Sequence, residues 1–110
     1  MYVPGTITET LTSLNDAVTV NIGSTNDIVF QVSGTWVGTV SYEVSVDGTN
    51  WLSQACKASD QNNSNQLITS STSNHICYLN SNGAPYFRVR MSAYTSGTAT
   101  VTIRATRYSK

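Results

Sequence analysis

Hydrophobic and polar residues alternate with a period of two along most of this 110-residue chain. No window of a dozen residues keeps the period of an amphipathic helix. Such alternation is typical of β-strands that have one face in a core and the other in solvent. The clear strands are 18–22, 28–32, 40–46, 87–93 and 99–105, and weaker patterns predict strands at 7–11, 67–68 and 76–78.

Gly, Asn and Ser gather where the alternation stops, which is typical of turns because Gly and Asn accept positive φ angles. We expect the stretches 86–94 and 98–107 to form a hairpin around such a turn. Eight or nine short, regularly spaced strands predict an all-β fold, a single antiparallel β-sandwich of jelly-roll or Ig-like type. The predicted turns are 23–26, 33–34, 47–50, 80–83 and 95–97.

The chain is long enough for one domain with a single core. No internal repeat or composition break divides it. We expect the β-sandwich domain to span 17–110, and residues 1–16 to form an N-terminal arm or an edge strand. The polar stretch 59–65 predicts a loop or a long connection.

The stretch 44–51 combines strand, turn and tryptophan signals. We expect Val44 and Val46 to point into the core and Trp51 to close the core or its edge. The turn Asp-Gly-Thr-Asn at 47–50 resembles a fragment of a calcium loop. It lacks the further oxygen ligands that calcium coordination requires, so a plain turn is expected.

Charged residues make up only 11% of the chain, whereas Ser, Thr and Asn fill 41 positions. A surface of hydroxyls and amides suits packing against other proteins or glycans. The formal net charge is zero. This composition argues against binding to nucleic acid or to an anionic membrane, since both require clustered Lys and Arg.

Acidic and basic residues are separated along the chain. All six acids lie at or before Asp60, and five of the six basic residues follow Phe87. Two interpretations are open. Early and late strands can neighbour each other and neutralise their charges within one chain, or copies of the chain can meet head to tail in an assembly.

The two cysteines, Cys56 and Cys77, match no Cys-x-x-Cys redox or zinc motif. We expect two free, buried thiols rather than a disulfide, because the start of the chain lacks the pattern of a signal peptide. No apolar run approaches the length of a membrane helix. The chain is therefore expected to be a small product made in the cytoplasm.

Catalytic motifs are missing from the sequence. His75 is the only histidine and is expected to be an ordinary strand or loop residue. The acids form no paired motif, and there is no phosphate-binding glycine loop or nucleophile elbow. We therefore expect no enzyme, no cofactor and no metal site.

The candidates for binding a partner or a glycan are aromatic and loop residues. Trp36 lies between two glycines, where it can stack on a sugar, insert into a partner or cap the core. Trp51 and Tyr94 lie beside turns, where amphipathic rings are common at interfaces. Asp60 and Asn62 belong to the polar loop.

The runs FQVSGTWVGTVSYEVSVDGTNW (30–51) and PYFRVRMSAYTSGTATVTIRATR (85–107) resemble a β-sandwich module of small structural proteins of tailed bacteriophages. The resemblance implies a virion component assembled in the host cytoplasm. A capsid decoration (cement) protein, which binds between capsid subunits and stabilises the shell, fits best. Its implied partners are the major capsid protein or other virion subunits, together with its own copies, with a trimer favoured.

The alternative is a module of a tail, fibre or baseplate that binds carbohydrate during host adsorption. The piece Ser-x-Asp-Gly-x-x-Trp at 45–51 also resembles discoidin-like carbohydrate-binding sandwiches. The rest of the chain does not match the ligand positions of a discoidin residue by residue.

Overall fold

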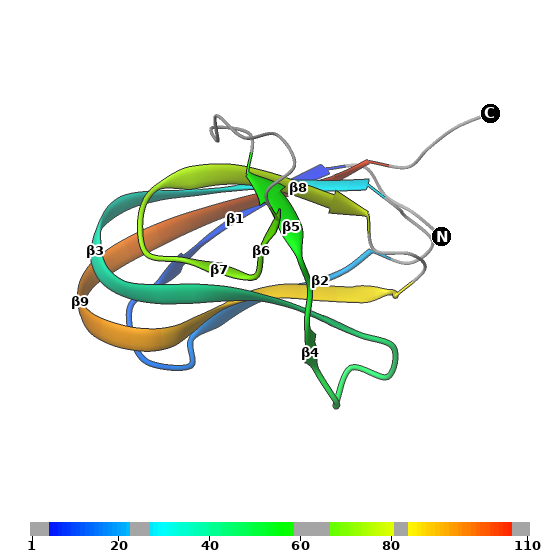
Figure 1. The fold of residues 1–110 in the computed structure, drawn as a ribbon, viewed down its shortest axis with the longest axis horizontal. Helices are drawn as coiled ribbons and strands as arrows, with labels where there is room; N and C mark the ends of the chain where they lie inside the picture. The colour runs from blue at the N-terminus through cyan, green and yellow to red at the C-terminus, as the bar shows by residue number, and fades with distance from the viewer. Residues whose placement is uncertain (1–4, 23–26, 59–66, 81–83, 107–110) are drawn as a thin grey trace.

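The computed structural model describes residues 5–22, 27–58, 67–80 and 84–106. These residues form nine antiparallel strands, which confirms the predicted all-β sandwich (Figure 1). No helix in the described part of the chain could cross a membrane. The strands are β1 (Gly5–Leu11), β2 (Ala17–Asn21), β3 (Asp27–Ser45), β4 (Leu52–Ser53), β5 (Cys56–Ala58), β6 (Leu67–Ile68), β7 (Ser70–Ser71), β8 (His75–Asn80) and β9 (Tyr86–Thr106).

Two long strands, β3 and β9, pair along their whole lengths and build both layers of the sandwich. The pairing runs from Asp27 opposite Thr106 to Ser45 opposite Tyr86. The first half of β3 pairs on its other side with β8, and the second half with β7 and β4. The two halves of β9 pair in the same way with β2 and β1. Figure 1 shows both long strands curving back at the left.

The bend in this ribbon corrects two sequence predictions. Residues 95–97 do not close a hairpin, and 33–34 do not end a strand, since both stretches lie inside continuous strands. Gly34 and Gly97 have φ angles of +119° and +90°. The pairing shifts register twice beside Gly38. Glycines with positive φ and extra residues on one strand are features of β-bulges, which bend a sheet without reversing the chain.

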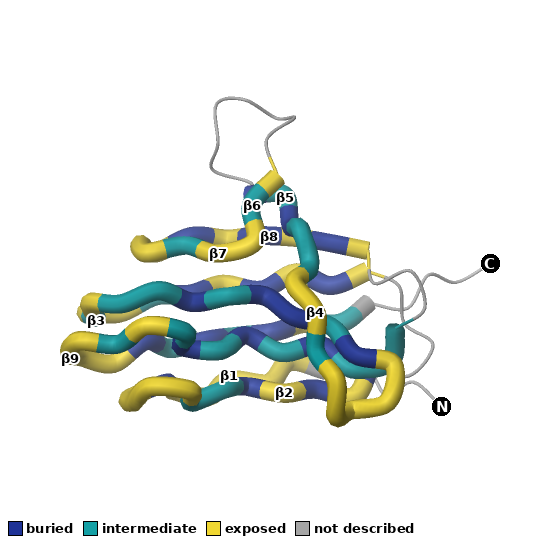
Figure 2. Tube along the Cα trace, turned by 60° about the horizontal axis from the view of Figure 1, so that its bottom comes forward, coloured by how far each residue is buried: buried dark blue, intermediate teal, exposed yellow. Residues whose placement is uncertain are grey.

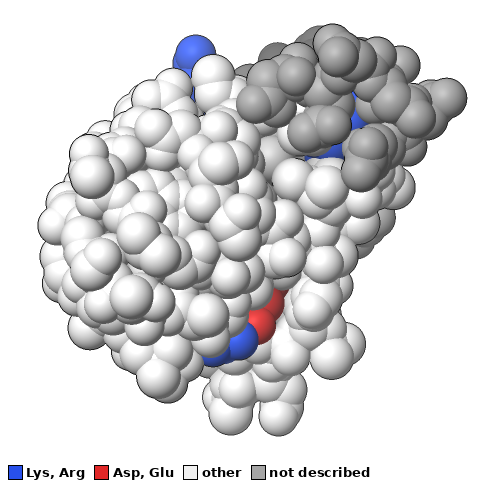
Figure 3. Space-filling view, turned by 60° about the vertical axis from the view of Figure 1, so that its left-hand side comes forward, with Lys and Arg blue, Asp and Glu red and all other residues white. Residues whose placement is uncertain are grey.

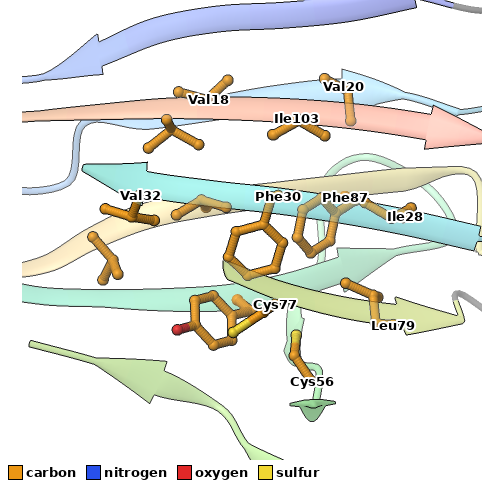
Figure 4. Packing of buried hydrophobic residues seen from close by; sticks show 14 of the residues in the cluster. Val18, Val20, Ile28, Phe30, Val32, Cys56, Cys77, Leu79, Phe87 and Ile103 are labelled. Carbon is orange, nitrogen blue, oxygen red and sulfur yellow. The ribbon is translucent and has the colours of Figure 1, made fainter. Parts of the chain in front are cut away.

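The alternating hydrophobic residues form the core, as predicted. Phe30 and Phe87 lie side by side in the core, with ring centroids 5.5 Å apart (Figure 4). The ring centroid of the fully buried Tyr42 is 4.8 Å from that of Phe30. Cys56 and Cys77 are buried free thiols, which confirms that prediction. Burial raises the pKa of the Cys56 thiol, so the thiolate is disfavoured.

The prediction that Val46 points into the core is wrong. Along β3, Val40 and Tyr42 are fully buried, Val44 is half-buried and packs against the core, and Val46 is 79% exposed. Val40, Tyr42 and Val44 lie on the same face of β3 because side chains alternate, and Val46 follows the last residue of the strand, Ser45. Exposure rises along them because the core ends beside Val44 while the chain continues.

The N-terminal segment contributes β1, the edge strand of one layer, paired over seven residues with β9. Leu11 at its end is fully buried. A short connection to β2 is fastened by the Asp16 carboxylate, whose Oδ2 accepts a hydrogen bond from the Thr12 amide at 2.9 Å. Asn15 in this connection takes a φ of 69°.

Candidate functional site

Trp36 lies at the ribbon bend, half-buried against the edge of the core. Its indole N–H donates a hydrogen bond to Asn74 Oδ1 at 3.0 Å. This contact ties the bend of β3 to the loop that precedes β8. It favours the core-capping interpretation of Trp36, and a role in binding a partner stays a prediction.

Trp51 lies at the other end of the ribbon, after the turn that follows β3. The guanidinium carbon of Arg88 is 4.2 Å from the centroid of the indole ring. Arg88 also donates from Nε to Glu43 Oε1 at 2.6 Å. Trp51 is half-buried, and Arg88 therefore covers one face of its ring and joins the turn to β9.

The remaining predicted binding residues do not gather into one site. Tyr94 is half-buried at the bend, and its hydroxyl donates to the carbonyl of Gly97 at 3.0 Å. It shares the bend with Trp36 and lies far along the ribbon from Trp51. Asp60 and Asn62 lie outside the described residues.

Glu43 gives one instance of charges that cancel within one chain, as the first of the two interpretations expects. Its carboxylate is 2.6 Å from Arg88 Nε and 3.0 Å from Arg90 Nη2, and its side chain is 11% exposed. Burial opposes ionisation, but hydrogen bonds from Arg90 and Arg88 outweigh it and lower the pKa of Glu43. The acid from the first half of the chain thus lies beside bases from the second half, as neighbouring strands require.

One face of the molecule shows few charged side chains. On the face shown in Figure 3, most of the visible area belongs to uncharged residues. Among the described residues, no three His, Cys, Asp or Glu side chains lie close enough together to hold a metal ion.

His75 is buried at the start of β8 and packs against Phe30 and Tyr42. Its Nδ1 lies 2.5 Å from the carbonyl of Ser73 and its Nε2 lies 2.5 Å from the Tyr42 hydroxyl. A carbonyl only accepts, so Nδ1 carries the proton and Nε2 accepts from Tyr42 in the neutral ring. Burial raises the pKa of Tyr42 above its ordinary value. This pair is a buried polar contact within the core.

The turn at 47–50 is a plain turn, as predicted, and it is well ordered by one side chain. Asp47 Oδ1 accepts from the amides of Thr49 and Asn50 and from the Ser45 hydroxyl, each at 2.9 Å. Its Oδ2 accepts from Asn50 Nδ2 at 2.8 Å. These hydrogen bonds hold the pKa of Asp47 well below its usual range, and those from the Asn50 and Thr49 amides contribute most. The turn is therefore held in one shape by local contacts.

This ordered turn presents an aliphatic surface that the sequence did not reveal. Val46 and Leu52 are 79% and 76% exposed, and Leu52 lies directly opposite Val44 in the β3–β4 pairing. These residues and Ala84 line an open groove of about 290 Å³. We call Val44, Val46 and Leu52 the β3–β4 ridge. Large, nearly bare aliphatic side chains on an ordered turn are a feature of contact surfaces.

A second groove, of about 410 Å³, lies over β3, β5 and β8. The β-ladder places Tyr78 between Val29 and Lys57, because it pairs with both. Tyr78 is 45% exposed, and Asp27 and Asn80 line one end of the same groove. An aromatic ring beside a carboxylate, an amide and an ammonium group is a combination suited to a small polar ligand. None of these residues was singled out from the sequence, because their spacing in the chain carries no motif.

Comparison with known proteins gives a likeness in fold. No family model matches the chain, and no curated protein matches it in sequence. YomS, a protein derived from the SPBc2 prophage, has a similar structure, with a TM-score of 0.76 at 12% identity over 96% of this chain and 97% of that one.

Two further solved structures are also similar. XepA, an exported protein of PBSX, gives a TM-score of 0.73 at 13% identity over 96% of this chain, which spans 39% of XepA. PirA gives 0.52 at 11% identity, covering 92% of this chain and 93% of that one. At these identities the comparisons show a shared fold.

Proposed function

We propose that this chain is a non-enzymatic structural protein of a bacteriophage particle, and specifically a capsid decoration protein. The observation that carries the proposal is the β3–β4 ridge, an exposed aliphatic surface on an ordered turn. The fold shared with YomS over nearly the full length of both chains supports a phage-related role.

The ridge has the properties of a protein contact. Val46 and Leu52 expose apolar surface, and burial of such surface on association is favourable. The hydrogen bonds of Asp47 fix the turn before binding, which reduces the entropy lost on association. A contact made by the three side chains of the ridge is small beside a standard interface of roughly 800 Å² per partner. It therefore stabilises a particle through many copies acting together.

The non-enzymatic part of the proposal rests on the positions of the reactive side chains. His75 is buried and both ring nitrogens have hydrogen-bond partners. Cys56 and Cys77 are buried, and burial raises the pKa of the Cys56 thiol. Buried groups of this kind serve packing rather than attack on a substrate.

Incorporation into particles tests the ridge. We compare Val46→Asp with Val37→Asp, since Val37 is a 56% exposed valine at the ribbon bend. Each substitution replaces an exposed valine with an aspartate, in β3 for Val37 and just after its last residue for Val46. The dissociation constant from the particle should rise about tenfold for Val46→Asp, a loss of about 1.4 kcal/mol per contact, and the copy number per purified particle should fall, whereas both should stay unchanged for Val37→Asp. Equal copy numbers for the two folded variants would contradict a contact through the ridge.

The second candidate function is a carbohydrate-binding module of a tail, fibre or baseplate. The groove around Tyr78 favours it, because Asp27 and Lys57 supply polar groups beside the ring. A glycan array with the wild type, Tyr78→Ala and Trp36→Ala separates the two candidates. Specific binding lost only in Tyr78→Ala supports this function at the groove, and loss only in Trp36→Ala supports it at the bend. A blank array for the wild type argues against it.

A further inference from the structure

The edge strand β1 is long and regular, and the charge of Glu9 is the one protective feature of its described residues. It pairs with β9 over seven residues without a bulge, and none of the other strands in the described part of the chain pairs with its other edge. Edge strands normally avoid pairing with other chains by being short or by carrying Lys, Pro, a bulge or an inward-pointing charge. The sequence of β1, Gly-Thr-Ile-Thr-Glu-Thr-Leu, has one charged residue, Glu9, and is rich in β-branched residues.

From residue 6 to residue 10, both faces of β1 are exposed, including the face that belongs to the core. Ile7 lies opposite Ile103 and Glu9 lies opposite Val101, and these two β9 residues are buried. Ile7 is nevertheless 43% exposed, and Glu9 is also exposed. Figure 2 shows β1 and β2 along one side of the molecule, with exposed residues on both. The second layer therefore leaves most of the inner face of β1 uncovered.

We propose that β1 pairs with β1 of a second copy of this chain, antiparallel about a twofold axis at Thr8. This register pairs all seven residues and keeps both cores on the same side of the joined sheet. It places Thr8 opposite Thr8 and Thr6 opposite Thr10 on the outer face, where threonine pairs are favourable. It places Ile7 opposite Glu9 on the inner face.

The charge of Glu9 selects this register over its neighbours. Pairing about Glu9 brings the two carboxylates directly opposite each other, which is unfavourable. Pairing about Ile7 leaves two of the seven residues of β1 without partners. Because the chain has no formal net charge, two copies have no overall repulsion to overcome. The interface has the same patch on both copies, as a twofold dimer requires.

A matched pair of lysine variants tests the proposal on the purified chain. Thr8 and Thr102 lie side by side on the outer face, with their hydroxyl oxygens 3.3 Å apart. Thr8→Lys and Thr102→Lys each remove that hydrogen bond and add one positive charge to the same face. Only Thr8→Lys places like charges opposite each other across the twofold axis, because Thr102 lies one strand further in.

Sedimentation equilibrium from about 1 μM to about 1 mM, the range of weak association, supplies the readout. We expect a wild-type dimer, a dissociation constant raised about tenfold in Thr8→Lys, and an unchanged constant in Thr102→Lys. Glu9→Gln should lower the dissociation constant, since the two carboxylates lie diagonally across the axis. A wild-type monomer over the whole range, an oligomer unaffected by Thr8→Lys, or equal losses in both lysine variants would each overturn the proposal. The readout does not depend on any role in a virion.

Discussion

Phe30 and Tyr42 belong to the same strand, β3, and their ring centroids are 4.8 Å apart. Residues of a straight strand so far apart in sequence cannot touch, because a strand rises by about 3.3 Å per residue. The contact exists because the β3–β9 ribbon folds over at its bend. The two halves of one strand thereby face each other across the core. The folded ribbon defines the core and also determines where it ends, beside Val44.

The bend depends on Gly97. A Cβ atom there would lie 2.3 Å from the Thr35 carbonyl oxygen, and the φ of +90° is strained for any other residue. We expect Gly97→Val to lower the free energy of unfolding by about 3 kcal/mol or more. Ser96→Ala, at an exposed position of the same bend, should change it by less than about 0.5 kcal/mol. Urea denaturation measures both, and equal stabilities would mean that the ribbon tolerates another geometry at 97.

Acid sensitivity should depend on Glu43. The pKa of Glu43 in the folded protein is lowered from its ordinary value of 4.5. Its stabilising contribution is therefore complete above that value and is lost as the pH falls through the lower, folded pKa. At pH 7, Glu43→Gln should lower the free energy of unfolding by about 1 to 3 kcal/mol, since Arg88 and Arg90 lose a buried partner. Urea denaturation measures this loss as a lower midpoint concentration.

The pH series completes this test. The difference in stability between wild type and Glu43→Gln should shrink as the pH is lowered from 7 to below 4.5, since the Glu43 carboxyl then binds protons more readily in the unfolded state than in the folded state. A difference that stays constant over this range would show that the hydrogen bonds to Glu43 do not favour its charged form.

The order of the turn at 47–50 should depend on Asp47. Asp47→Ala removes the acceptor for the amides of Thr49 and Asn50. Hydrogen exchange at these two amides should become faster, while exchange at the β3–β9 pairs stays unchanged. Because the pKa of Asp47 lies well below its usual range, the two amides of the wild type should stay protected from exchange when the pH falls below the pKa of an ordinary aspartate. Unchanged exchange in Asp47→Ala would mean that other contacts hold the turn.

Aspartate substitutions in β3 and just after it should differ in their effect on stability and so show where the core ends. Val40→Asp should prevent folding, because it buries an unpaired charge at a fully buried position. Val46→Asp should change the free energy of unfolding by less than about 0.5 kcal/mol, because Val46 is 79% exposed. Circular dichroism melts measure both. A large loss in Val46→Asp would show that the core extends past Val44.

The sequence predicts local features well and their boundaries poorly. Alternation identifies the inward positions of the strands, and the aspartate at 47 identifies its turn. The cluster at 95–97 fits a hairpin and a bulge equally well, since both use Gly with a positive φ. The chain forms a bulge and not a hairpin at 95–97 because β9 pairs with β3 on both sides of the bend. Nothing local reveals that choice.

The candidate surfaces are also non-local. Val46 follows the inward pattern, but it is bare because the facing layer ends before it. Tyr78 gains its surroundings from β3 and β5, which are distant in the chain. Trp36 and Trp51 stand out in the sequence, yet the structure engages both with neighbours within the chain.

The central claim is that the chain is a structural component of a phage particle, and quantitative mass spectrometry of purified particles tests it most directly. Particles from the source of the chain should contain it in many copies, in a fixed ratio to the major capsid protein, as a decoration protein requires. Absence of the chain from washed, intact particles would contradict the claim. A few copies that purify with the tail would instead support the host-adsorption module.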